Sequence, residues 1–382
     1  MTTRTSAHVL WTLTVMLAVQ AASAEPASDP REALRQFDAM VDPAIAQALA
    51  GPGSNDQGGI AWGQAYVLQG LAEVLEATRD PGYADRFVRL ADWALAARDD
   101  RHGRRDEVRG RVVKAWSSTK YTEGRRYAWA VHTGMIVAPL AQFAAVVRRD
   151  PALASKYAHY AERFLDAARE SVAVHEDEYR EGPAPDEGHL WILATNTRAP
   201  LNMQNALARA WIWIDEAAAT RRHRDHVTRL ARFFRHRVRT ADSGAFVWAY
   251  HPPLEGRDES FEDISHASIN VDFAVLCFEQ GIVFTRDDLA AFGKTLLTNV
   301  IRPGPASANT VGGTGGTDKY ARSVLRWGRL ARHSDAVRRA IVEFWHNSRK
   351  DAETSPLGLA YLVAATAPRT STPPATSRGT RP

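Results

Sequence analysis

A repeat with a period of about 70 residues restricts the fold of this chain more than any other feature of its sequence. Residues 79–81 (Arg-Asp-Pro) recur as residues 149–151, and matching basic, aromatic and small residues follow both copies. A weaker third copy lies at residues 230–233 (Leu-Ala-Arg-Phe). The segment before each copy holds a different side chain at the equivalent position of the repeat: Trp62, His132 and Asn202, each 70 residues after the last. We call this shared position the phase of the repeat. The repeat therefore indicates a series of similar units that carries a variable site.

Helical periodicity runs through most of the chain. Apolar residues recur at spacings of three and four, without the sustained alternation that a half-buried strand needs. Pro81 and Pro151 stand at the favoured first-turn position of a helix. The expected helices cover roughly residues 31–50, 61–78, 83–98, 126–148, 152–172, 202–220, 224–239, 267–280, 286–300, 319–332, 335–348 and 356–366. In pairs, about twelve helices make six or seven helical hairpins.

Hairpins in series form either an open solenoid or a closed ring. Segments near residues 127–131, 208–214 and 271–276 are apolar on nearly all sides, as the inner helices of a ring would be. The Arg-rich segment at 222–239 suits an outer layer. Solenoid repeats have periods of about 34 to 47 residues. The longer period here favours an all-α fold, an α/α toroid over residues 25–367.

Both ends of the chain differ in composition from the helical part. Arg4, the apolar residues 9–19 and the small residues 22–24 have the order of a secretory signal peptide and its cleavage site. An amphipathic first helix is the alternative. We expect residues 1–24 to be removed and the mature protein to be periplasmic or secreted. The tail at 368–382 is rich in Pro, Thr, Ser and Arg and is expected to be disordered.

Charge and cysteine content narrow the classes of function. The 382 residues carry a net charge of +4, which suits an anionic partner in a cleft but is too small to indicate nucleic acid. Cys277 is the single cysteine, so no intramolecular disulfide can form, and it is expected to be a buried, inert thiol. His223 and His226 have a ligand-like spacing without a carboxylate in register, so neither a metal nor a cofactor is expected.

Polar residues gather at the expected starts of the inner helices. In a toroid these starts open onto one cleft, so residues distant in sequence would converge there. Each residue alone is also consistent with a helix cap or a satisfied buried group, but the shared phase favours a site. The candidates are His132; Asn202, Gln204 and Asn205; His266, Asn270 and Asp272; and Tyr320, Arg322 and Arg326. Trp248 and His189, from polar loops, are added as substrate-binding residues.

Two of these residues have the chemistry of proton transfer. His266 lies in a dense polar stretch before a buried helix and suits a base or a proton donor to a carboxylate. Tyr320 follows the Gly-rich residues 312–317 and is flanked by Lys319 and Arg322, whose charges favour a phenolate. A tyrosine in this state can take a proton and return it. The alternative for Tyr320 is a place in the core.

Three short motifs carry a resemblance to a known family. They are residues 202–205 (Asn-Met-Gln-Asn), Glu259 with residues 262–267 (Glu-Asp-Ile-Ser-His-Ala), and residues 319–322 (Lys-Tyr-Ala-Arg). In these motifs the chain resembles the alginate and glucuronan lyases of polysaccharide lyase family 38, which are α/α toroids. The resemblance implies that Tyr320 serves as base and acid. It also implies that His266, Asn202 and Glu259 neutralise the carboxylate of a uronate.

The sequence thus predicts a secreted lyase that cleaves alginate, glucuronan or a similar anionic polysaccharide by β-elimination. Arg322, Arg326 and the basic residues 104–105 are expected to attract the polyanion. A uronyl epimerase on the same toroid and a non-catalytic polysaccharide-binding protein are alternatives, because a fold does not fix a function. A glycoside hydrolase is a further alternative. It needs two carboxyl groups, and the candidates for this pair are Glu187, Glu259, Asp263 and Asp272.

Overall fold

Two concentric layers of helices make up the described part of the chain. The computed structural model describes residues 30–251, 260–304, 306–316, 318–348 and 355–366, and the predicted signal peptide and tail lie outside these ranges. The inner helices are α2 (Ala65–Thr78), α4 (Ala130–Arg149), α6 (Leu201–Ala218), α8 (Ile264–Glu279), the 3₁₀ helix η5 (Asp318–Arg332) and α11 (Pro356–Thr366). The outer helices are α1 (Pro30–Leu49), α3 (Pro81–Ala96), α5 (Pro151–Val172), α7 (Arg224–Arg235), α9 (Arg286–Lys294) and α10 (Asp335–Ser348).

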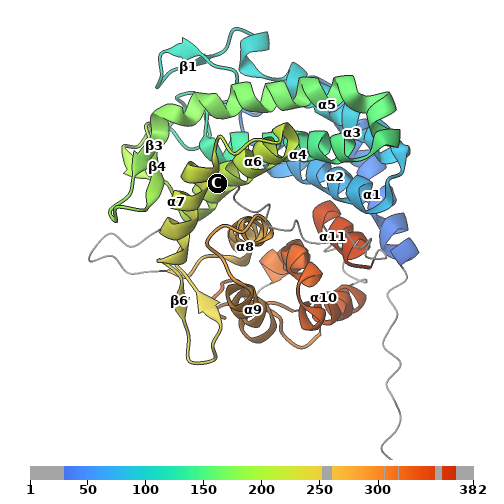
Figure 1. Ribbon diagram of the computed structural model, residues 1–382, viewed down its shortest axis with the longest axis vertical. Coiled ribbons are helices and arrows are strands. Elements are labelled where there is room, and N and C mark those ends of the chain that lie inside the picture. Colours follow the sequence, from blue (N-terminus) through green and yellow to red (C-terminus); the bar gives the residue numbers. More distant parts are fainter. Residues whose placement is uncertain (1–29, 252–259, 305, 317, 349–354, 367–382) are drawn as a thin grey trace, which may run out of the picture.

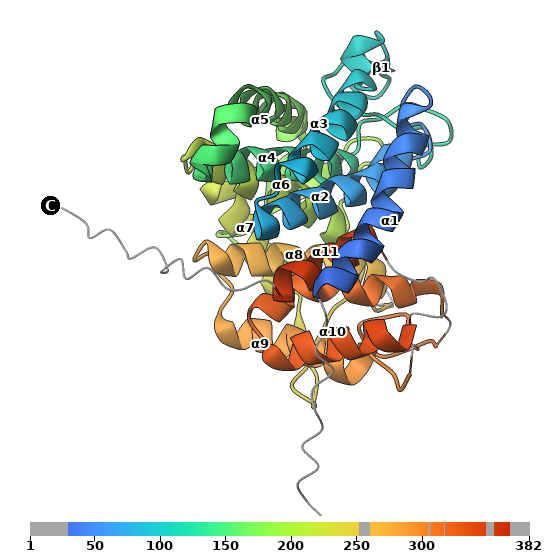
Figure 2. The same ribbon diagram turned by 90° about the vertical axis from the view of Figure 1, so that its right-hand side faces the viewer.

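The inner helices form a closed ring. Each one contacts the next in chain order, and α11 returns to contact α2. The outer helices alternate with them along the chain, so that α3 and α5 cover α2 and α4, while α10 packs on η5 (Figure 1). Helix α1 lies against both α3 and α11 and covers the point of closure (Figure 2). The predicted all-α toroid is therefore confirmed, with six hairpins.

The repeated Arg-Asp-Pro sequence is explained by helix capping. The Asp80 side chain accepts a hydrogen bond from the Gly82 amide (2.8 Å) at the start of α3. The Asp150 side chain accepts from the Ala152 amide (2.9 Å) at the start of α5. Proline follows each aspartate at the first helical position, where its missing amide hydrogen costs nothing. The repeat thus begins two outer helices in the same way, as the sequence predicts.

Short strands in the long loops were not predicted. Strands β1 (Arg105–Asp106) and β2 (Arg111–Val112) pair before α4, and β6 (Arg239–Thr240) and β7 (Phe246–Val247) pair before α8. A three-stranded antiparallel sheet of β3 (Tyr179–Glu181), β4 (Gly188–Ile192) and β5 (Thr197–Arg198) precedes α6. These strands have two to five residues, too few to produce a visible alternation in the sequence. They shape the loops that lead into the inner helices.

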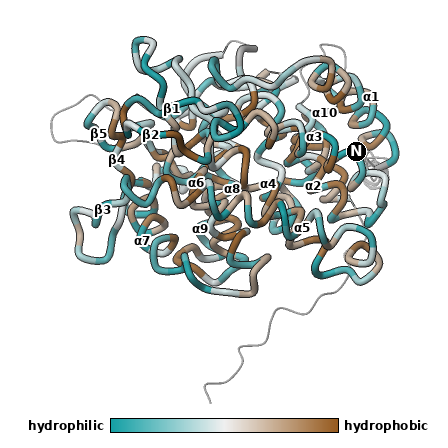
Figure 3. The backbone as a smooth tube through the Cα atoms, turned by 90° about the horizontal axis from the view of Figure 1, so that it is seen from above, coloured by the Kyte–Doolittle hydropathy of each residue, from teal (hydrophilic) through white to brown (hydrophobic). Residues whose placement is uncertain are grey.

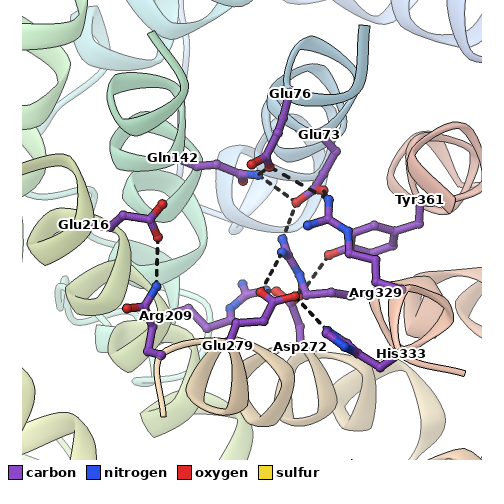
Figure 4. Close-up of polar contacts among 12 residues, drawn as sticks. Glu73, Glu76, Gln142, Arg209, Glu216, Asp272, Glu279, Arg329, His333 and Tyr361 are labelled. Carbon is purple, nitrogen blue, oxygen red and sulfur yellow. Dashed lines mark hydrogen bonds and ion pairs between the residues drawn. The ribbon is translucent and has the colours of Figure 1, made fainter. Parts of the chain in front are cut away.

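A buried ion network ties the six inner helices together at the centre of the ring. Asp272 accepts hydrogen bonds from Gln69 (3.2 Å), Arg209 (2.5 Å), Tyr361 (3.0 Å) and Arg329. Arg329 also pairs with Glu73, which accepts a bond from Gln142 (2.8 Å). The side chains point inward from all sides of the ring (Figure 4). We call this set the axial network; its members are Gln69, Glu73, Gln142, Arg209, Asp272, Arg329 and Tyr361.

The axial network changes the interpretation of two predicted site residues. Asp272 is 3% exposed, and its hydrogen-bond partners Gln69, Arg209, Arg329 and Tyr361 all belong to the network. Burial alone would raise its pKa, but the guanidinium groups of Arg329 and Arg209 hold the pKa of Asp272 at about 2. Asn270, two residues earlier, is fully buried and bonds to Asn205 and Glu262. Both side chains therefore hold the inner helices together.

Removing Arg329 should destabilise the whole ring. Arg329→Met keeps much of the side-chain volume but leaves Glu73 and Asp272 short of a cation inside the protein. We expect the free energy of unfolding to fall by about 3–5 kcal/mol, measured in urea. The exposed pair of Arg163 with Asp92 offers a control, because Arg163→Met should leave the free energy nearly unchanged. Equal effects in the two variants would contradict a central role for the axial network.

Candidate functional site

Five aromatic and imidazole rings meet at the end of the toroid where the inner helices begin. The Trp62 ring, from the π-helical turn η1 (Ile60–Gln64), lies 5.6 Å from the His132 ring and 6.2 Å from the His266 ring. Tyr121 lies 6.1 Å from His132, and Tyr250 lies 5.2 Å from His266. We call these five residues the aromatic cluster. It joins the starts of α2, α4 and α8, as the shared phase of the repeat predicts.

The start of α6 lies beside the same cluster. The Leu201 amide donates a hydrogen bond to the Tyr250 carbonyl (3.4 Å). Asn202, the next residue, is 1% exposed, and neither its amide nitrogen nor its carbonyl oxygen has a hydrogen-bond partner among the described residues. Buried polar atoms without partners are rare in native proteins, so this side chain is a candidate for binding a ligand.

His266 is oriented by an aspartate. Asp263 caps α8 by accepting hydrogen bonds from the amides of Ser265 (3.0 Å) and His266 (3.1 Å). Its second oxygen lies 2.6 Å from Nδ1 of His266. Burial alone would raise the pKa of Asp263, but His266 and the capped amides hold this pKa below its usual value. In a neutral imidazole, Nδ1–H donates to this carboxylate and the lone pair lies on Nε2 of the half-buried ring. An imidazole in this tautomer can act as a base.

His132 faces a donor at Nδ1, whereas His266 faces an acceptor there. Its Nδ1 lies 3.1 Å from Nδ2 of Asn55, which also donates to the Trp116 carbonyl (3.0 Å). Because the amide group is a donor, Nδ1 of His132 is the acceptor and Nε2 carries the hydrogen. Burial, with a smaller effect of Lys120, lowers the pKa of His132 to about 3, so the ring is neutral at neutral pH. Its Nε2–H is a buried donor without a partner among the described residues.

Two indoles add further donors of the same kind. The Nε1 atoms of Trp62 and Trp129 are buried and have no partner in the described part of the chain. Trp129 precedes α4, and its ring lies 5.6 Å from Tyr121, edge to face. Tyr121 is 43% exposed and its ring contacts those of His132 and Trp129. The donors are thus covered in this structure, and Tyr121 is the exposed ring beside two of them, His132 and Trp129.

Arg326 connects the starts of three inner helices. Its Nε donates to Ser355 Oγ (3.1 Å), immediately before α11. Its Nη1 lies 3.4 Å from Ser265 Oγ, beside His266, and its guanidinium lies 4.0 Å from the centre of the Tyr66 ring in α2. Tyr320 begins the same helix η5 six residues earlier; it is half-buried and packs against the core. Arg322, between them, is exposed.

Three predicted substrate-binding residues have structural roles instead. Gln204 accepts a hydrogen bond from the Leu190 amide (3.0 Å) and donates to the Ala199 carbonyl (2.7 Å), so it holds β4 and β5 on α6. Asn205 donates to Asn270 (2.7 Å) between α6 and α8. Trp248 is fully buried in the core and its indole donates to Glu262. All three side chains are thus engaged in hydrogen bonds within the protein.

Two predicted residues remain, Glu259 and His189. Glu259 falls outside the described residues. His189 lies in β4, where its ring stacks on Phe233 of the outer helix α7 at 5.7 Å, away from the aromatic cluster. Figure 3 shows β3, β4 and β5 at one edge of the molecule, with α4, α6 and α8 in the middle. Among the residues described, no group of three or more His, Cys, Asp or Glu side chains is placed to hold a metal ion.

The sequence did not identify Asn55, Tyr121 and Tyr250 as site residues. All three lie in long connections before inner helices, where the sequence has no periodicity to follow. Asn55 bonds both to His132 and, through Oδ1, to the Ala61 amide (3.1 Å) at the start of η1. One signal was available for the neighbouring Trp62, because it shares the phase of His132 and Asn202.

Comparisons with known proteins give a fold-level likeness. A scan against protein-family models found no match to this chain, and a search of curated proteins found none. Among solved structures the chain is similar to the α-1,6-mannanase GH76A of Salegentibacter sp. HEL1_6, an inactive variant with two aspartates replaced by alanine, in complex with α-1,6-mannotetrose. The match has 12% sequence identity and a TM-score of 0.47, and covers 79% of this chain and 87% of that one. This likeness assigns no activity to the present protein.

The buried state of His132 can be tested by titration. Since its pKa is lowered to about 3, its ring resonances in nuclear magnetic resonance spectra should stay constant between pH 8 and about pH 4. The unfolded chain takes up this proton below about pH 6.5, so His132 reduces stability as pH falls through that window. A His132→Asn variant assigns the resonance. Titration near pH 6.5 would show that His132 is solvated and that the donor role is wrong.

Proposed function

We propose that the protein is a polysaccharide lyase that cleaves a uronate-containing polysaccharide by β-elimination at the aromatic cluster. The observation that carries this proposal is the combination of unpartnered neutral donors with an oriented imidazole. The donors are His132 Nε2, Asn202 Nδ2 and the indole nitrogens of Trp62 and Trp129. The imidazole is His266, held by Asp263. The proposal includes an exported enzyme, because the N-terminal residues have the order of a signal peptide.

The chemistry of elimination needs this kind of site. The proton on C5 of a uronate is weakly acidic while the neighbouring carboxylate is fully charged. Preorganised donors at the carboxylate oxygens stabilise the charge that develops when the proton leaves. Neutral donors from His132 and Asn202 supply this stabilisation, and binding requires the Tyr121 ring to turn aside.

Two residues move the protons in this proposal. Nε2 of His266 takes the C5 proton, the C4–O bond breaks, and the Tyr320 hydroxyl donates its proton to the departing oxygen. The product carries a double bond between C4 and C5. Arg326 contacts Ser265, the residue before His266, while the exposed Arg322 attracts the polyanion. Glu259, which the family resemblance includes among the neutralising residues, stays a proposed participant.

Hydrolysis is the alternative that an experiment must separate from elimination. A glycosidase needs two carboxyl groups on either side of the bond. Glu187 is bound to His236 (2.6 Å) and Arg237 (2.9 Å), and Asp272 belongs to the axial network. Asp263 serves His266 and the cap of α8. These engagements favour elimination over hydrolysis.

One assay distinguishes the candidate reactions. The purified protein is incubated separately with glucuronan and alginate, and ultraviolet absorbance of the unsaturated product is followed together with reducing ends. A lyase raises both signals in proportion. Reducing ends without absorbance indicate a hydrolase, and overturn the proposal. Neither signal with both polymers also overturns it, leaving an epimerase or a binding protein.

Two variants test the proton-transfer residues. Asp263→Asn retains a capping side chain but no longer fixes the proton on Nδ1 of His266, so turnover should fall by about 10²–10⁴ while the melting temperature changes little. Asp80→Asn makes the same change at the cap of α3 and should leave turnover unchanged. Tyr320→Phe should lower turnover by a similar factor of about 10²–10⁴ with normal folding. Turnover near wild type in either site variant would remove that residue from the mechanism.

A further inference from the structure

A concave site lies at the edge of the toroid, on the sheet formed by β3, β4 and β5. It is an open pocket of about 430 Å³, a size that suits one or two sugar rings. Arg180 pairs with His189 across β3 and β4, and Trp191 pairs with Arg198 across β4 and β5. Paired residues share a face, and residues two apart on one strand do so too. All four side chains therefore lie on one face of the sheet; we call this site the rim pocket.

Positive charge at the rim pocket exceeds the negative charge available to neutralise it. The guanidinium groups of Arg198 and Arg237 both lie over the Phe233 ring, at 5.5 and 3.4 Å from its centre. Glu187 is a nearby carboxylate, but Arg237 and His236 already engage it. Burial, together with a smaller effect of repulsion from Arg237, lowers the pKa of Arg198. An anion at Arg198 would relieve this repulsion.

Two buried polar atoms in the rim pocket have no partner among the described residues. They are Nδ1 of His189 and Nε of Arg198. His189 is only 6% exposed, and burial together with Arg198, Arg237 and Arg180 lowers its pKa to about 4. The ring is therefore neutral at neutral pH and able to donate or accept one further hydrogen bond. Native proteins seldom leave such atoms unsatisfied without a functional reason.

Trp191 adds a flat apolar surface beside the charges. Its indole nitrogen donates to Asn196 (3.0 Å), which fixes the ring, and the ring lies 6.2 Å from that of His189. Glu181 is the single acidic residue in the described pocket lining. It follows Arg180 in β3, so its side chain belongs to the opposite face of the sheet. An aromatic face next to a cationic group is suited to the apolar face of a sugar that carries a carboxylate.

We propose that the rim pocket binds one uronate unit of an acidic polysaccharide outside the catalytic site. The carboxylate lies at Arg198 and His189, and the sugar ring lies on Trp191. This rests on the proposed function only for the identity of the polymer. The pocket is separate from the aromatic cluster because His189 packs on the outer helix α7, whereas the cluster residues adjoin the starts of inner helices. The pocket thus holds a chain of substrate against the toroid.

Binding of a monosaccharide tests this proposal independently of any lyase activity. The full-length protein is titrated with sodium D-glucuronate, methyl glucoside and sodium sulfate, and the ring resonances of His189 are followed by nuclear magnetic resonance. D-glucuronate should shift them saturably, and the neutral methyl glucoside should not. Arg198→Gln and Trp191→Ala should each weaken binding at least tenfold. Arg163→Gln, on the outer helix α5, should bind as the wild type does.

Three results would overturn the proposal. They are the absence of a saturable shift with D-glucuronate in the wild type, equal binding by Arg198→Gln, and binding of sulfate at least as tight as that of D-glucuronate. The last result would show a simple anion site without recognition of the sugar. A protein that fails the lyase assay but binds D-glucuronate in this pocket would refute the proposed function alone.

Discussion

The ion network around Asp272 is the interaction on which the rest of the structure depends. Every inner helix contributes a side chain to the axial network, so the network closes the ring as well as filling its centre. Buried charges are costly unless each one is paired and hydrogen-bonded. Asp272 meets this condition through two arginines, a glutamine and a tyrosine that come from four other helices. The register of the inner helices is thereby fixed with respect to one another.

A fixed register allows the end of the ring to hold polar groups that contribute little to stability. His132, Asn202 and Trp62 are placed there with unpartnered polar atoms, because the axial network and the apolar layers hold their helices in place. The Asp263 carboxylate combines two tasks at this end, since it caps α8 and orients His266. The arrangement separates the part of the inner ring that provides stability from the part proposed to bind substrate.

Much of the fold followed from the sequence, but less of the site did. The period of about 70 residues and the Asp-Pro caps predicted the closed ring, because capping and helical periodicity are local properties. The shared phase of Trp62, His132 and Asn202 correctly indicated that helix starts converge. The hydrogen bonds of Gln204, Asn205 and Trp248 were not predicted, since their partners come from β4, α8 and Glu262 and depend on tertiary packing. Asn55 and Tyr121 lie in irregular loops that no period describes.

The central claim is that the neutral donors at the aromatic cluster bind the carboxylate of a uronate. A crystal structure of the His266→Ala variant with a tetrasaccharide of glucuronate tests it most directly, because this variant should not cleave its ligand. We predict one carboxylate within about 2.7–3.2 Å of both His132 Nε2 and Asn202 Nδ2, with the Tyr121 ring turned away from His132. A bound tetrasaccharide whose carboxylates face solvent, with Tyr121 still covering His132, would contradict the account.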